Sequence, residues 1–142
     1  MAILTGKAYW SFITTPNTRF TPVYSINLVV DDETAAQFEA DGFKVKDTEE
    51  GKTLVIKRDV ENKQGVKMQP PKLYDRSMRE VDIAIGNGST VKVDYRPWEA
   101  TWKGKVFKGL DLRAVQIVDL IEYGGSEEGL TPIDSNLEDS YI

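Results

Sequence analysis

Aromatic and cationic side chains are interleaved most densely in residues 96–108. This segment of thirteen residues contains two tryptophans, one phenylalanine and four cations. Cations neutralise anionic groups and aromatic rings stack on other flat faces, so the segment is the densest candidate for ligand contact. Its candidate contact residues are Arg96, Trp98, Trp102, Lys103, Lys105, Phe107 and Lys108.

Charge is distributed unevenly along the chain. Residues 1–123 hold 18 basic and 18 acidic side chains, so the formal net charge of −5 comes from five acids after Tyr123. Residues 31–50 alone hold eight acids and two lysines, which leaves the other segments of this body with 16 basic and 10 acidic groups. A basic surface beside a detachable acidic arm favours a polyanionic ligand.

The segment 124–142 is expected to be a flexible acidic tail. It contains no Lys or Arg and ends in an aromatic and an aliphatic residue. This composition favours an interaction arm over an ordinary frayed terminus. The tail residues expected to contact partners are Glu127, Glu128, Asp134, Glu138, Asp139, Tyr141 and Ile142.

The composition argues against several classes of function. The chain has neither cysteine nor histidine, so we expect no disulfide framework, no metal site and no cofactor. Acid–base catalysis at neutral pH relies mostly on histidine or a perturbed carboxylate pair, so we expect no enzyme. No signal-like N-terminus and no apolar run of about 18 residues is visible, so we expect a cytoplasmic protein without a membrane partner.

A β-hairpin is predicted at the start of the chain, followed by a short helix. Residues 7–13 are rich in aromatics, residues 20–30 alternate between polar and apolar types, and residues 14–19 supply turn residues. Asp31 provides an N-cap and Gly42 ends the helix. The acids in its first turn are better explained by the helix dipole than by a metal site.

The remaining chain is read as strands around one irregular stretch. Residues 61–80 lack periodicity and carry five cations against three acids, so they form a functional arm or a disordered insertion, and we favour the arm. Asn-Gly within residues 86–89 favours a tight hairpin turn between two short strands. The strands are predicted over residues 53–60, 82–85, 90–95 and 110–121.

These elements predict a small OB-fold-like antiparallel β-barrel of five to six strands with one short helix. A chain of 142 residues is long enough for one domain that buries roughly 70% of its unfolded surface. We therefore expect residues 1–123 to form the binding domain, with 61–80 as a basic loop insertion, and 124–142 to form the tail.

Strand alternation assigns side chains to opposite faces. Lys7 and Tyr9 share one face of the first strand, which we expect to face solvent, whereas Trp10 and Phe12 are expected to pack in the core. Tyr95 is likewise expected in the core.

The neighbours Lys57 and Arg58 occupy opposite faces of their strand, so only one of them lines a groove. The sequence leaves that choice open.

Several runs resemble the single-stranded DNA-binding proteins of tailed bacteriophages, and the resemblance covers most of the chain. What carries the likeness is the order of the runs, which are 6–10 (GKAYW), 22–31 (PVYSINLVVD), 70–72 (PPK), 85–89 (IGNGS) and 112–120 (LRAVQIVDL). The resemblance implies an OB-fold that coats unwound strands during phage replication and recombination, in the host cell cytoplasm. It also implies that the acidic tail contacts replication proteins such as the polymerase or the helicase.

The residue types fit this ligand. A single strand presents phosphates to Lys and Arg, and it presents base faces to aromatic rings without regard to sequence. The tail is expected to compete with the strand for the basic groove. Outside residues 96–108, the candidate DNA contacts are Lys7, Tyr9, Arg19, Tyr24, Lys57, Arg58, Lys72 and Lys92.

Other interpretations stay open at this point. A non-catalytic β-barrel module, such as a small virion or scaffold protein, would bind protein or glycan through the same aromatic segment. An exposed edge strand or an exchanged tail would permit a homodimer, although nothing in the composition requires one. The choice of DNA over RNA follows from the resemblance alone.

Overall fold

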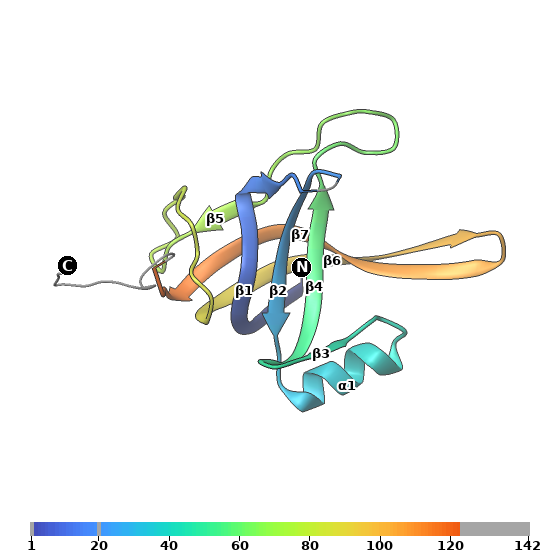
Figure 1. Ribbon diagram of the computed structural model, residues 1–142, viewed down its shortest axis with the longest axis horizontal. Coiled ribbons are helices and arrows are strands. Elements are labelled where there is room, and N and C mark those ends of the chain that lie inside the picture. The colour runs from blue at the N-terminus through green and yellow to red at the C-terminus, as the bar shows by residue number, and fades with distance from the viewer. Residues whose placement is uncertain (1, 20, 123–142) are drawn as a thin grey trace, which may run out of the picture.

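Five strands close into a barrel in the computed structural model, which describes residues 2–19 and 21–122 (Figure 1). Neighbouring strands pair antiparallel in the order β4-β2-β1-β6-β7, and a parallel bridge from Lys57 to Asp111 joins β4 back to β7. The OB-type barrel predicted from the sequence is confirmed. The barrel strands are β1 (Ala2–Asn17), β2 (Val23–Val29), β4 (Gly51–Asp59), β6 (Ser89–Trp102) and β7 (Lys105–Asp119).

Strand alternation fills the barrel. Alternate residues of the central strands are fully buried, including Ile26 and Leu28 of β2, Leu54 and Ile56 of β4, and Leu112 of β7. The residues between them face outward and are polar, charged or only half-buried. The interior is therefore apolar, which leaves the outer face of the sheet available for contact.

The helix α1 (Asp32–Ala40) lies at one end of the barrel, next to the short strand β3 (Lys46–Thr48) (Figure 1). As expected, Asp31 caps it, because the Asp31 Oδ1 accepts the backbone N–H of Thr34 at 2.7 Å. Phe38 packs against Phe43 and Tyr95, with ring centroids 5.5 and 5.9 Å away. No helix in the described part of the chain is long and apolar enough to cross a membrane.

Residues 61–80 contain more structure than their lack of periodicity indicated. The strand β5 (Lys72–Tyr74) pairs parallel with β7, and Leu73 is fully buried. Two side chains organise compact turns on either side: Asn62 Oδ1 accepts the N–H groups of residues 64 and 66, and Asp75 Oδ1 accepts those of residues 77 and 79. Polar residues that looked irregular in sequence are therefore turn-forming residues.

The predicted hairpin over residues 82–95 is wrong. Residues 82–84 belong to no strand, and Ile85 forms only an isolated bridge, to Glu122. The long hairpin is instead β6–β7, which turns at Lys103 and Gly104, both at positive φ, and stays paired out to Trp102 and Lys105. Its outer half is exposed on both faces, so the sequence there shows no alternation that would reveal two strands.

The closure of the barrel generates a stability prediction. Arg58 donates two hydrogen bonds to Asp111, at 3.0 and 2.7 Å, where both side chains are largely buried. The substitution Asp111→Ala leaves the Arg58 guanidinium without its carboxylate partner, so we expect the free energy of unfolding to fall by about 1–3 kcal/mol. Urea denaturation followed by circular dichroism measures this change.

A matched control is Asp47→Ala, which removes an exposed ion pair with Lys52 on the neighbouring strand. Exposed pairs contribute little, so no measurable change is expected there. Equal stability of the two variants would contradict a closing role for the Arg58–Asp111 pair.

Candidate nucleic-acid interface

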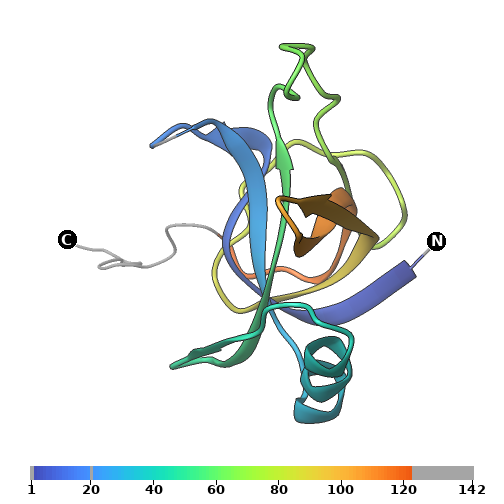
Figure 2. The same ribbon diagram turned by 90° about the vertical axis from the view of Figure 1, so that its right-hand side faces the viewer.

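A groove runs between the outer face of β4 and the base of the β6–β7 hairpin. Figure 2 looks along this hairpin, which projects toward the viewer above α1. The groove consists of two hollows, and Lys57 and Trp98 line both of them. We call it the hairpin groove. Its other lining residues are Phe43, Lys44, Lys46, Val55, Phe107, Lys108, Gly109 and Leu110 in one hollow, and Arg58, Asp59, Asn62, Met68, Arg96 and Asp111 in the other.

Trp98 owes its position to a glycine on the facing strand. Trp98 pairs with Gly109 across the hairpin, and a Cβ added at Gly109 would lie 2.3 Å from Trp98 Cζ2. The indole therefore lies against bare backbone, while 46% of the residue's surface stays exposed. This arrangement holds a large ring at the groove wall and leaves it accessible for stacking.

Lys57 and Arg58 both line the groove, but they differ in exposure and in bonding. Lys57 is exposed on the outer face of β4 and lines the groove. Arg58 contacts Asp111 and also donates to the Gln69 carbonyl at 3.1 Å. Its hydrogen bond to Asp111 raises the pKa of Arg58 above its ordinary value, with burial acting in the opposite direction. Arg58 thus supports the groove wall, and Lys57 supplies the free cation.

The outer hairpin presents the remaining aromatic and basic residues of the segment 96–108. Trp102 is 63% exposed, and the Lys103 ammonium lies 4.6 Å from the centroid of its ring. Lys105 and Phe107 are exposed on the returning strand.

Lys108 differs from the other hairpin cations because it is already engaged. Its ammonium donates to the Asp41 carbonyl at 2.5 Å and lies 3.6 Å from Glu99 Oε1 and 5.4 Å from the Phe43 ring centroid. Lys108 therefore braces the hairpin against the end of α1.

The outer face of β1, β2 and β4 adjoins the groove. Strand register aligns Tyr9 with Asn27 and Val55 in one row across the three strands. Lys7 is exposed and Tyr9 is partly exposed on this face, as predicted.

Two sequence predictions need correction here, for Tyr24 and for Trp10. Tyr24 is only 7% exposed and belongs to the core, because its register places it on the inner face of β2. Lys92 lines a separate hollow with Ile3 and Tyr74, and Lys72 lies on β5, so both lie outside the hairpin groove and their role as DNA contacts stays a prediction. Trp10, expected in the core, is 63% exposed, because an irregularity in β1 interrupts the alternation after Tyr9.

Other predicted residues have definite places as well. Tyr95 packs against the core as expected, and its burial raises the pKa of its phenol. Arg19 lies in the loop between β1 and β2, where its backbone N–H donates to Asn17 Oδ1. The tail residues Glu127, Glu128, Asp134, Glu138, Asp139, Tyr141 and Ile142 lie outside the described residues.

Sequence reasoning missed three contributors to the groove. Lys44 and Lys46 were obscured by the acidic residues around them, although their spacing places both on one face of an extended segment. Gly109 had no signal of its own, since its role depends on the cross-strand partner Trp98. Among the described residues, no group of three or more potential metal ligands lies together.

Comparison with known proteins gives a consistent fold. No protein-family model and no curated protein matches the sequence. Among solved structures, gp2.5, a single-stranded DNA-binding protein encoded by bacteriophage T7, is similar with a TM-score of 0.61 at 19% identity, over 92% of this chain and 99% of that one. The single-stranded DNA-binding protein of bacteriophage Enc34, in complex with single-stranded DNA, is similar with a TM-score of 0.60 at 14% identity, over 85% and 88%. These likenesses confirm the fold that the resemblance implied.

The contact between Trp98 and Gly109 generates a second prediction. In a protein whose only tryptophan is Trp98, made with Trp10→Phe and Trp102→Phe, Gly109→Ala should displace the indole into water, because the new methyl would occupy its place. The expected result is a red shift of the tryptophan emission maximum. The control is Gly109→Ala in a protein that retains only Trp102, where no shift is expected; a shift there instead would contradict the local contact.

Proposed function

We propose that this chain binds single-stranded DNA without sequence preference and protects unwound strands during phage DNA replication and recombination. The observation that carries the proposal is the hairpin groove, where Lys44, Lys46, Lys57 and Arg96 are interleaved with the exposed ring of Trp98. Cations follow the phosphates and rings stack on the bases, each base contributing about 1–3 kcal/mol. Stacking is independent of base identity, so binding of this kind has no sequence preference.

The position of the groove within the fold supports the same ligand. OB-folds bind oligonucleotides on the face of their second and third strands and with the loops that join strands one to two and four to five. In this barrel those strands are β2 and β4, and the connection between the fourth and fifth strands is the hairpin β6–β7. The similar proteins from phages T7 and Enc34 are single-stranded DNA-binding proteins, which supports the same class of ligand.

The acidic tail completes the proposal. Five carboxylates in residues 124–142 are complementary in charge to the groove, so the tail competes with DNA for the same cations. DNA that displaces the tail frees it to dock on replication proteins such as a polymerase or helicase. Coating a strand in this way requires neither a cofactor nor turnover.

The third prediction tests the groove. Titration of the full chain with a polypyrimidine strand of about 30 nucleotides should quench tryptophan fluorescence strongly, and the quenching should fade with salt and be nearly absent for the matching duplex.

Lys57→Ala should reduce the slope of log affinity against log salt by about 0.7, the value for one phosphate contact on a single strand. Trp98→Ala should weaken binding roughly fivefold to a hundredfold, measured by anisotropy of a labelled strand.

The matched control is Lys92→Ala, an exposed strand lysine outside the groove, for which an unchanged slope is expected. The absence of quenching at low salt, or a shallow salt dependence, would contradict strand coating. Either result would favour a β-barrel interaction module that binds protein or glycan.

The fourth prediction tests the tail. Deleting residues 124–142 should tighten single-strand binding, because the deletion removes a competing anion from the groove. A full-length variant with the five tail acids changed to their amides should bind as tightly as the truncated protein, which separates charge from chain length. Unchanged or weaker binding by both variants would rule out competition and leave only partner docking.

A further inference from the structure

Trp10 stands out of β1 at an irregular point in the strand. Its φ is +51°, a conformation uncommon for a bulky side chain. The loop that contains Asn87 and Gly88 holds the backbone on both sides of this point. Asn87 Oδ1 accepts the Trp10 N–H at 2.8 Å, and the Gly88 N–H donates to the Ala8 carbonyl at 2.8 Å. The backbone that carries the exposed indole is therefore held in place, and strained backbone of this kind concentrates at functional sites.

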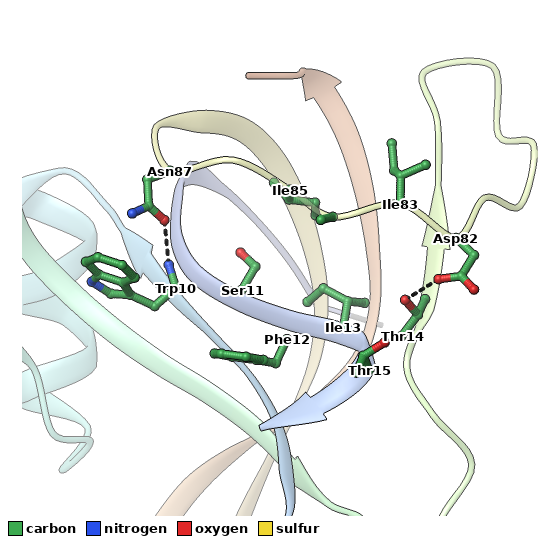
Figure 3. Close-up of a pocket in the computed structure, with 11 residues that line it drawn as sticks. Trp10, Ser11, Phe12, Ile13, Thr14, Thr15, Asp82, Ile83, Ile85 and Asn87 are labelled. Carbon is green, nitrogen blue, oxygen red and sulfur yellow. Dashed lines mark hydrogen bonds between the residues drawn. The ribbon is translucent and has the colours of Figure 1, made fainter. Parts of the chain in front are cut away.

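A hollow of about 290 Å³ lies beside Trp10, between β1 and the segment 82–87 (Figure 3). Figure 3 shows Ser11 and Ile13 directed from the strand toward this segment, on which Ile85 lies near them and Ile83 points away. Most of the side chains that line the hollow are either apolar or polar without charge.

Charge in the hollow identifies the chemistry of its ligand. The charged lining residue is Asp82, whose carboxylate accepts a hydrogen bond of 2.5 Å from the Thr14 hydroxyl, and neither Lys nor Arg lines the hollow. Such a site does not suit a phosphate. It suits a neutral, flat ring with polar edges, which a nucleobase supplies.

The hollow and the hairpin groove lie at opposite ends of one surface. Strand register aligns Phe12, which lines the hollow, with Ser25 on β2 and with Lys57, which lines the groove. Neighbouring strands are about 4.8 Å apart, so the row from β4 to β1 spans about 10 Å. Tyr9 and Asn27 occupy the parallel row beside it.

We propose that Trp10 and the adjacent hollow form a second base-binding site, which holds a base of the same strand after that strand has crossed β4, β2 and β1. This inference rests on the proposed function. It assigns base stacking at the far end of this path to Trp10. The other two tryptophans lie on the hairpin. Bases bound at both ends fix the strand across the sheet.

Tryptophan fluorescence tests the site directly. In the full chain with Trp98→Phe and Trp102→Phe, Trp10 is the only tryptophan. Saturation with an oligothymidine of about 30 nucleotides, with binding verified by anisotropy of the labelled strand, should quench its emission. Unchanged emission at saturation would overturn the proposal.

Affinity provides an independent readout. Trp10→Ala should weaken binding roughly fivefold to a hundredfold, whereas Trp10→Phe should retain most of the affinity because it keeps a ring. Ile3→Ala is the matched control, since Ile3 is an exposed residue of the same strand that lines a different hollow, and its affinity should be unchanged. Thermal unfolding of Trp10→Ala verifies that the variant is folded.

The outcomes separate this site from the proposed function. If Lys57→Ala and Trp98→Ala weaken binding and a folded Trp10→Ala does not, the second site is wrong and strand binding stands. If none of the three weakens binding, the hairpin groove is also wrong as the binding site, whereas strand binding itself is tested by the quenching and its salt dependence. If deletion of residues 124–142 changes Trp10 emission without DNA and DNA does not, the hollow holds the tail and the proposal is overturned.

Discussion

The architecture of the protein depends on the closure between β4 and β7. A single parallel bridge from Lys57 to Asp111 joins the two strands, and the Arg58–Asp111 ion pair reinforces it. Because β7 is also one arm of the hairpin, the closure holds the base of the hairpin against the outer face of β4, and that contact makes the groove. Arg58 forms the bond to Asp111 that supports the groove wall, and the exposed Lys57 beside it faces the groove.

Sequence patterns predicted the parts of the fold in which one strand face is buried. Alternation located β2, β4 and the central part of β7, and the N-cap Asp31 located α1. Alternation carried no information where both faces are exposed, as in the outer hairpin, or where a strand has three residues, as in β5. At Trp10 the pattern misled, because the bond from Asn87 that turns this residue outward comes from a loop 77 positions away.

The candidate site shows the same division between local and distant information. Residue types identified the segment 96–108 and the exposed Lys7–Tyr9 face correctly as surface, because both follow from composition and period. The choice among cations did not follow from either. Arg58 and Lys108 are engaged by Asp111 and Asp41, whereas Lys44 and Lys46 enter the groove from an acidic stretch of sequence. Only the folded arrangement distinguishes a bracing cation from an available one.

The paired outer hairpin has a consequence for how such a protein changes over generations. Backbone hydrogen bonds hold its two strands together out to Trp102 and Lys105, and its side chains there contribute little to the buried core. Substitutions at these exposed positions therefore cost little folding stability, whereas substitutions inside the barrel lower the folding stability directly. Affinity for the ligand can thus drift or be tuned on the hairpin while the scaffold stays under separate constraint, with Gly109 beneath Trp98 as the point where the two requirements meet.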